Sequence, residues 1–266
     1  MNNTSSNKTS SIIGIFDSGL GGLTILNQLK SDYPNNQFIY FGDTAHLPYG
    51  TKSKESIIQF CDDIVQFLIS KGATIIVVAC HTASAVALNY LKKTYDIPII
   101  GVLESSINTA INQTTSNHIT VLGTHTTIAS HSYKNKIIKI NENIIVNEIE
   151  CPLFVPIVEE GLENTKISLL AARLYLDNIN NGNVDTVILG CTHYPILINT
   201  INKIINSNIH IIDTGLSVSA DINNLVCSLA TCDNDRYYVT DVPYRFNTLA
   251  SKFLKYKINK IEHVRL

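Results

Sequence analysis

Short apolar runs alternate with helical patterns along almost the whole chain. Most of the apolar runs are continuous, as strands are when both faces of a parallel sheet are covered. The stretches between them place apolar residues on one helical face, most clearly over Ser53–Lys71, after which Gly72 acts as a stop. This alternation predicts an α/β fold with parallel sheets. The predicted strands are Ser11–Phe16, Gln37–Phe41, Thr74–Ala79, Ile97–Val102, His118–Leu122, Ile144–Ile149, Val184–Leu189 and Ile209–Ile212.

Unusual residues gather where the predicted strands end. Ligands of parallel α/β sheets bind beyond the carboxyl ends of the strands, so this is where we expect the functional site. The residues at these ends are Asp17-Ser18 with a glycine-rich turn, Gly42-Asp43-Thr44 with Pro48-Tyr49-Gly50, Cys80-His81-Thr82, Gly123-Thr124 and Cys191-Thr192-His193.

Two cysteines stand out from the other four. A weak internal repeat relates Thr74–Cys80 to Thr186–Cys191, because in each an apolar strand delivers a cysteine to its tip. Two related lobes would place both tips in one cleft. Both cysteines precede a loop-to-helix transition, which favours an anion and predicts a lowered thiol pKa. Cys61 and Cys227 lie in helical apolar patterns and are assigned to the core, whereas Cys151 and Cys232 have no comparable setting.

Two further polar residues, Asp17 and His193, allow both a functional and an ordinary interpretation, whereas an acidic pair allows only the ordinary one. Asp17 either caps a helix or belongs to a turn whose glycines let the backbone approach a small carboxylate; the turn matches no phosphate-binding motif. His193 either tunes Cys191 and carries a proton or simply satisfies a hydrogen bond. Glu159 and Glu160 follow an apolar segment, and on sequence alone they read as a solvated helix start.

Composition narrows the class of protein. At 266 residues, with 45% apolar and 16% charged residues, the chain is globular and near the size at which one core divides into two. Its net charge of −2 gives no case for nucleic acid or a membrane surface as partner. The longest apolar run, Ala73–Cys80, is too short to span a bilayer. Residues 1–10 read as a flexible polar tail rather than a signal peptide, so we expect a cytoplasmic protein with reduced thiols.

Taken together and in order, the motifs resemble those of glutamate racemases over essentially the whole chain. The matching segments are GIFDSGLGGLTIL, YFGDTAHLPYG, VVACHTASA, IPIIGVLE, VLGTHTTIASHSY, LFVPIVEEG, LGCTHYPIL and IDTG. The resemblance implies two pseudo-symmetric α/β domains with the active site in the cleft between them, here residues 1–97 plus 208–266 and residues 98–207. It implies racemisation of glutamate without pyridoxal phosphate or metal, supplying D-glutamate for peptidoglycan. A homodimer is among the expected assemblies.

The resemblance also implies roles for individual residues. Cys80 and Cys191 would be the catalytic thiols, Asp17 and His193 auxiliary groups beside them, and Glu159 a support for His193. His81 departs from the family, which usually has Asn there. A charged His81 could tighten anion binding, lower the pKa of Cys80 or obstruct glutamate. Substrate contacts would come from Asp17, Ser18, Pro48, Tyr49, Gly50, His81, Thr82, Thr124 and Thr192.

Three alternatives remain open from the sequence. His81 leaves room for aspartate or another acidic amino acid as substrate. A thiol hydrolase could use a cysteine with His193 and Asp17, although the second cysteine would then lack a role. A zinc site could use Cys80, His81, Cys191 and His193, but the short ligand spacings usual for structural zinc are missing.

Overall fold

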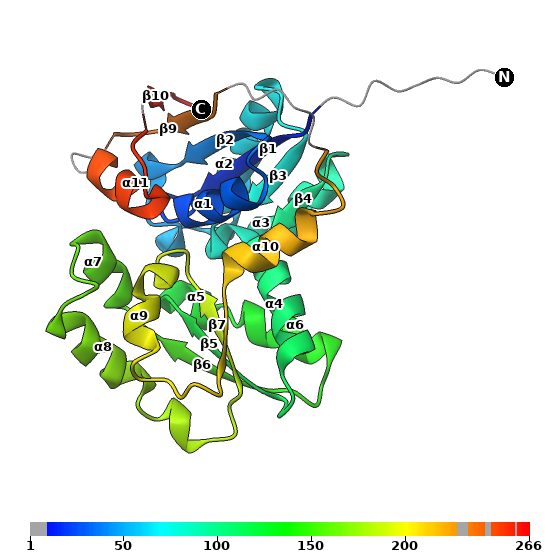
Figure 1. Ribbon diagram of the computed structural model, residues 1–266. Coiled ribbons are helices and arrows are strands. Elements are labelled where there is room, and N and C mark those ends of the chain that lie inside the picture. The colour runs from blue at the N-terminus through cyan, green and yellow to red at the C-terminus, as the bar shows by residue number, and fades with distance from the viewer. Residues whose placement is uncertain (1–9, 228–233, 243–245, 259) are drawn as a thin grey trace.

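The chain folds into two lobes, each built on a parallel β-sheet. In this computed structural model, residues 10–227, 234–242, 246–258 and 260–266 are described, and the lobes lie one above the other in Figure 1. All eight predicted strands are present, and both sheets have helices on both faces. The expectation of an α/β protein with two parallel sheets is confirmed.

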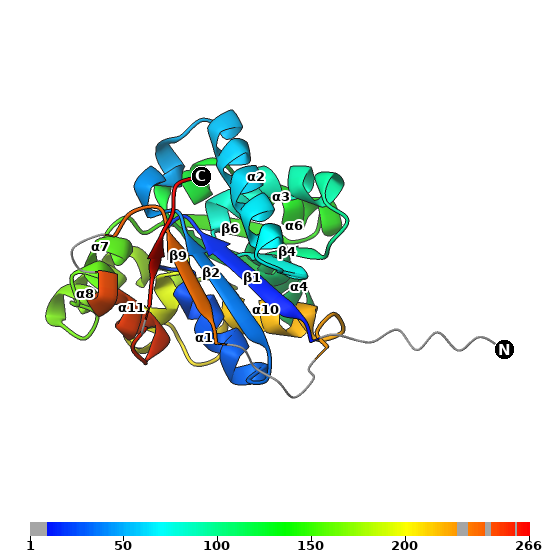
Figure 2. The same ribbon diagram turned by 90° about the horizontal axis from the view of Figure 1, so that it is seen from above.

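The first lobe contains a six-stranded sheet in the order β10-β9-β2-β1-β3-β4. Helices α2 (Lys54–Ser70) and α3 (His81–Thr94) cover one face, and α1 (Leu23–Asp32), α10 (Thr214–Ile222) and α11 (Phe246–Leu254) lie on the other (Figure 2). Ser53 caps α2 by accepting a hydrogen bond from the Ser56 amide. The strands are β1 (Ile12–Asp17), β2 (Gln37–Gly42), β3 (Ile75–Val78), β4 (Ile99–Gly101), β9 (Arg236–Val239) and β10 (Glu262–His263).

The second lobe contains a four-stranded sheet in the order β6-β5-β7-β8. One face packs on α4 (Val102–Gln113) and α6 (Ser132–Ile140), and the other on α7 (Phe154–Glu159), α8 (Lys166–Leu176) and α9 (Ile198–Ile201). The strands are β5 (His118–Gly123), β6 (Ile145–Glu150), β7 (Thr186–Gly190) and β8 (His210–Ile212). The short elements are α5 (His125–Ala129) and the 3₁₀ turns Thr44–His46, Tyr49–Thr51, Ile179–Asn181 and Tyr194–Leu197.

The chain passes from the first lobe to the second and returns. Strand β4 hydrogen-bonds within the first sheet and β8 within the second, so sheet membership changes after residue 101 and again after residue 212. The expected domain boundaries, at 97/98 and 207/208, lie a few residues before these points and remain a prediction. Helices α4 and α10 pack against each other where the two crossings meet.

Some sequence-based expectations differ from the structure. The strands β9 and β10 were not predicted, although β9 pairs in parallel with β2. Cys227 was assigned to a buried helical face, but it is half-buried and follows the end of α10. The tail prediction for residues 1–10 falls, except for Ser10, outside the described residues, as does Cys232. No helix in the described part of the chain has the length and apolar character to cross a membrane.

Candidate active site

A cavity of about 400 Å³ opens between the carboxyl ends of the two sheets. The first lobe contributes the ends of β1 and β3 and the loop after β2, and the second contributes the ends of β5 and β7 together with α7. The placement in the cleft follows the general rule for parallel sheets. Every site residue named from the sequence lines this cavity: Asp17, Ser18, Pro48, Tyr49, Gly50, Cys80, His81, Thr82, Thr124, Glu159, Cys191, Thr192 and His193.

Cys80 lies at the junction of β3 and α3, where it is the N-cap of the helix. Its sulfur accepts a hydrogen bond from the Ala83 amide at 3.5 Å, and its thiol donates to Ser18 Oγ at 3.5 Å. Burial, together with the nearby Asp17 carboxylate, raises the pKa of Cys80 to about 11, although the Ala83 amide and the Ser18 hydroxyl, which can rotate to donate to a thiolate, act in the opposite direction. The expectation of a lowered pKa at this cysteine was therefore wrong, and Cys80 is a thiol at neutral pH.

Asp17 ends β1 and is buried beneath the cavity. Its carboxylate accepts a hydrogen bond from the Gly19 amide at 2.9 Å. Burial raises the pKa of Asp17, although the Gly19 amide and the charge of His193 act in the opposite direction. Asp17 thus interacts electrostatically with the first thiol and with the histidine of the second lobe.

Cys191 lies in a different setting at the end of β7. The helical turn that follows it, Tyr194–Leu197, is a short 3₁₀ segment, and the sulfur instead lies 3.9 Å from His193 Nδ1. His193 Nε2 lies 3.3 Å from Glu159 Oε1, an ion-pair contact without the alignment of a hydrogen bond. Burial lowers the pKa of His193, but Cys191 and Glu159 together outweigh it and raise this pKa to about 10. His193 therefore holds a proton beside the second thiol at neutral pH.

The glycine-rich turn of the first lobe packs directly against this second thiol site. A Cβ atom placed on Gly21 would lie 2.0 Å from Thr192 Oγ1 and 2.7 Å from His193 Nδ1. The Thr24 hydroxyl donates a hydrogen bond to the Thr192 carbonyl at 3.0 Å. Glycine is therefore required at position 21 because the backbone there packs closely against Thr192 and His193 of the other lobe.

His81, the departure from the family pattern, is buried and uncharged. Its Nδ1 lies 2.7 Å from the Tyr133 hydroxyl of α6, while Nε2 is buried without a hydrogen-bond partner. Burial lowers the pKa of His81 to about 3, so the ring is neutral at pH 7. The added cation considered from the sequence is therefore not present at this position.

Comparison with known proteins identifies the family. The family model described as Asp/Glu/Hydantoin racemase matches residues 24–218. The chain belongs to this racemase family. The glutamate racemase of Geobacter metallireducens is 40% identical over 260 residues, covering 96% of each chain. A crystal structure of glutamate racemase from Francisella tularensis in complex with D-glutamate has a TM-score of 0.87 and 38% identity, covering 96% of this chain and 98% of that one. A Bacillus anthracis glutamate racemase gives a TM-score of 0.88 at 32% identity, with the same coverage.

The racemase is thus an isomerase, and its cavity contains further residues that the sequence did not single out. Thr126 and Thr127 belong to the polar run directly after β5, so the threonine-rich pattern there was an available signal. Apolar wall residues carry no such signal in a sequence rich in apolar positions. The additional lining residues are Gly19, Leu20, Leu47, Thr51, His125, Thr126, Thr127, Val155 and Gly190.

Of the other cysteines that the structure describes, Cys61, Cys151 and Cys227 do not line the cavity. Cys61 is buried in the core, as predicted. Cys151 follows β6 directly, yet its thiol points to the Ile149 carbonyl at 3.7 Å, and burial raises its pKa to about 12. Among the residues that the structure describes, no three His, Cys, Asp or Glu side chains are arranged to hold a metal ion. The zinc-site alternative thus gains no support from this geometry.

Proposed function

We propose that this racemase interconverts L- and D-glutamate by moving the α-proton between Cys80 and Cys191, without a cofactor. The observation that carries the proposal is that one thiol from each lobe lines the same cavity. Inversion at Cα needs a base on one face of a planar carbanion and an acid on the other. Two cysteines from opposed lobes meet this requirement, with their roles exchanged in the reverse direction.

The neighbouring side chains have distinct proposed roles. His193 stores a proton beside Cys191, and Glu159 supports its charge. Asp17 acts on Cys80 through its charge and fixes the turn at Gly19. Hydroxyl and amide donors in the cavity bind the two carboxylates of the substrate, where a water-poor environment strengthens each hydrogen bond. The proposed substrate contacts are Asp17, Ser18, Pro48, Tyr49, Gly50, His81, Thr82, Thr124 and Thr192.

The decisive experiment follows the α-hydrogen in heavy water. L-Glutamate should yield D-glutamate with deuterium at Cα, while residual substrate stays largely unlabelled early in the reaction. The reason is that the group delivering the new proton is not the group that removed the old one. The same assay on aspartate and other acidic amino acids tests the substrate alternative. Absence of α-hydrogen exchange on every acidic amino acid, or a thioester intermediate, would contradict the proposal and favour a hydrolase.

The absence of a cofactor requirement is tested separately. Dialysis against a chelator should leave the rate unchanged, and the active protein should show no Schiff-base absorption. We further propose that the enzyme works in the cytoplasm and supplies D-glutamate for peptidoglycan, as its family resemblance implies. Depletion in the source bacterium should then be rescued by external D-glutamate; failure of that rescue would separate the enzyme from cell-wall synthesis.

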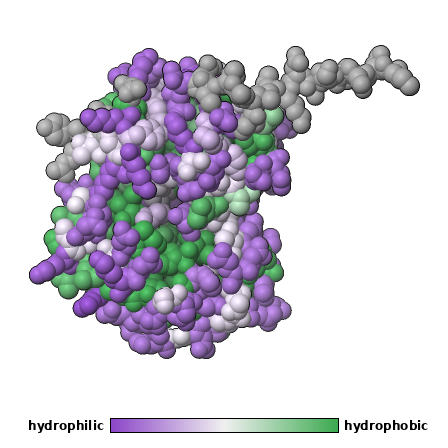
Figure 3. All heavy atoms as spheres, in the orientation of Figure 1, coloured by the Kyte–Doolittle hydropathy of each residue, from purple (hydrophilic) through white to green (hydrophobic). Residues whose placement is uncertain are grey.

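We also propose a homodimer, supported by an apolar stripe on α8. Ile167, Leu170 and Leu174 are 53%, 65% and 72% exposed. Helix α8 belongs to the lower lobe of Figure 1, and Figure 3 shows apolar side chains among polar ones on the surface of that lobe. Lys166 and Asp177 bracket this stripe, so antiparallel pairing of two copies of α8 would bring opposite charges together. Sedimentation velocity should show a dimer that Leu170→Glu converts to a monomer, and a monomeric wild-type protein would contradict this.

A further inference from the structure

We propose that Asp43 is a positioning residue that holds one wall of the active-site cavity in place and ties it to the C-terminal strand β9. The sequence placed Asp43 among the unusual residues at the strand ends, but the proposed chemistry gives it no role. Asp43 and Thr240 do not line the cavity. Any effect on the reaction therefore passes through the loop between them and the substrate. The assay of this inference rests on the proposed racemisation of glutamate.

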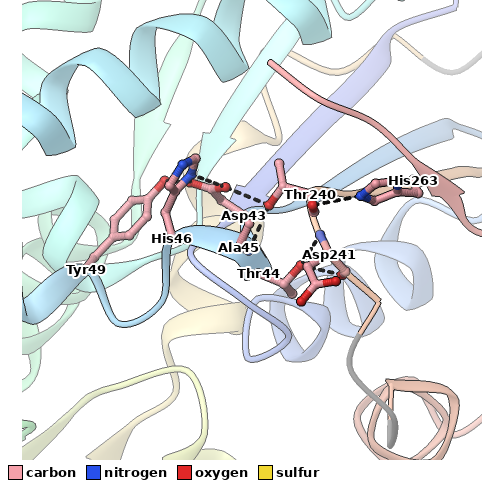
Figure 4. Close-up of polar contacts among 8 residues, drawn as sticks. All are labelled: Asp43, Thr44, Ala45, His46, Tyr49, Thr240, Asp241 and His263. Carbon is pink, nitrogen blue, oxygen red and sulfur yellow. Dashed lines mark hydrogen bonds and ion pairs between the residues drawn. The ribbon is translucent and has the colours of Figure 1, made fainter.

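The Asp43 carboxylate is buried, and both of its oxygens have partners (Figure 4). The Tyr49 hydroxyl donates to Oδ2 at 2.6 Å, and the Thr240 hydroxyl donates to Oδ1 at 2.8 Å. His46 Nδ1 lies 2.8 and 3.0 Å from the two oxygens. Burying a carboxylate destabilises the folded protein unless hydrogen-bond donors surround it. The loop must therefore adopt this conformation to supply the donors. Two of the three donors come from the loop after β2, and the third is Thr240, which directly follows β9 and is almost two hundred residues away in sequence.

The C-terminal strand region is joined to the same loop by several hydrogen bonds. Thr240 Oγ1 also accepts a hydrogen bond from the Ala45 amide at 2.9 Å. Thr44 Oγ1 accepts from the Asp241 amide at 2.9 Å and donates to the Asp241 carbonyl. His263 Nε2 lies 2.9 Å from the Thr240 carbonyl, which extends the network to β10. Figure 4 shows these groups in one continuous line from Tyr49 to His263.

The loop held by Asp43 is a wall of the cavity. Tyr49 is only 2% exposed, and Leu47, Pro48, Gly50 and Thr51 line the cavity with it. From the second lobe, the Thr126 hydroxyl donates to the Gly50 carbonyl at 2.8 Å. The loop is therefore fixed from two sides, by Asp43 in its own lobe and by Thr126 across the cleft. Loosening the Asp43 side should weaken substrate binding while leaving the two thiols, which lie on other elements, in place.

Thr240→Val tests this inference without changing any residue of the cavity. It removes the hydroxyl bonded to Asp43 and preserves side-chain shape. We expect KM for glutamate to rise about three- to tenfold in both directions, with kcat within about twofold of wild type. Asp43→Asn should act in the same way and more strongly. Thr109→Val is the matched control, because its hydroxyl bonds only within α4, to the Ser105 carbonyl. It should change neither constant.

Amide hydrogen exchange over residues 44–51 gives a readout that does not depend on activity. Exchange in this loop should be faster in Thr240→Val than in wild type or Thr109→Val, with circular dichroism unchanged. Unchanged exchange, or faster exchange with an unchanged KM, would overturn the positioning role. If wild-type protein shows no exchange of the glutamate α-hydrogen, the proposed function fails, and the loop measurement still decides whether Asp43 and Thr240 hold the loop. Should Asp43→Asn not fold, Thr240→Val carries the test alone.

Discussion

The surroundings of Cys80 and Cys191 differ more than the strands that carry them. Both cysteines follow the end of a central strand, in the first and second sheet respectively. Cys80 meets a helix N-terminus, Ser18 and the Asp17 carboxylate, and burial raises its pKa. Cys191 meets a histidine that keeps its proton at neutral pH. The two thiols therefore hold similar positions at the ends of their strands, while the chemistry around them differs.

The equal free energies of the two enantiomers limit which measurements can detect the difference between the two thiol sites. L- and D-glutamate have equal free energies, so kcat/KM in the two directions must be equal in every variant. A change near one thiol therefore lowers both values together. What can differ between the directions is the step that limits the rate, which an α-deuterium isotope effect reports for each enantiomer. The comparison between the thiols thus requires isotope effects as well as rates.

Replacing either thiol should have the largest effect. Cys80→Ala and Cys191→Ala each remove one of the two groups that we propose exchange the proton, so we expect kcat to fall by about 10³-fold or more in both directions. The fold should persist, because both residues lie at strand ends. Cys227→Ala, a half-buried cysteine outside the cavity, is the control and should retain activity. A Cys80 or Cys191 variant with wild-type turnover would rule out the two-thiol mechanism.

His193→Asn should cost about 10²-fold in kcat, because it removes the proton held beside Cys191. The α-deuterium isotope effect should change for one enantiomer more than for the other, since only one thiol site is altered. In wild type, raising the pH through about 10 removes the proton from His193, and activity should fall there. His210→Asn, at an exposed position on β8, is the control. An equal change of the isotope effect for both enantiomers on going from wild type to His193→Asn would contradict the distinct roles of the two sites.

The sequence predicted the positions of the site residues better than their chemistry. The strand ends could be located because apolar runs mark buried parallel strands, and such strands end at one edge of a sheet. The helix N-terminus at Cys80 was also foreseen, but burial and the distance to Asp17 depend on packing between residues far apart in sequence. For the same reason, the contact between His81 and Tyr133, 52 positions apart, could not be predicted.

Short-range sequence patterns also gave missing or wrong predictions for a short strand, β9, and for a residue that follows the end of a helix, Cys227. Strand β9 has only four residues, and it reads as a strand only once its pairing with β2 is known. Cys227 fits an apolar helical spacing, but α10 ends at Ile222, five residues before it. The Asp43 network joins residues 43–49 to residues 240–263, and short-range sequence patterns cannot predict contacts between segments so far apart.

Gly21→Ala should have a smaller effect than loss of His193, and it tests how far the Cys191 site depends on the opposite lobe. The added methyl would collide with Thr192 Oγ1 and His193 Nδ1. Relief of that overlap must move the lobes apart or displace His193, at a cost of about 1–3 kcal/mol. We expect kcat/KM to fall about tenfold, measured on protein whose folding is checked by thermal melting. Gly182→Ala, where an added Cβ would meet no atom within 4 Å, should be neutral. Equal activity for both variants would show that the contact is dispensable.

His81→Asn should have the smallest effect at neutral pH, about 1 kcal/mol of stability from the weakened contact with Tyr133. Its clearer consequence is in the pH dependence of stability. The pKa of His81 is about 3 in the folded protein and near 6.5 in the unfolded chain, so between these pH values the unfolded chain binds this proton and the folded protein does not. His81 therefore contributes stability above pH 6.5 that is lost progressively as the pH falls toward 3.

Urea unfolding between pH 4 and 7 measures this loss. The His81→Asn variant should show a shallower rise of unfolding free energy with pH than wild type or His210→Asn. His193 supplies an internal reference. Because its pKa is raised to about 10, its proton contributes stability that is fully present below pH 6.5 and is lost as the pH rises through about 10. His81→Asn should leave the pH dependence of stability in that higher range unchanged. Identical slopes for the variant and wild type below pH 6.5 would show that His81 is not held neutral by burial.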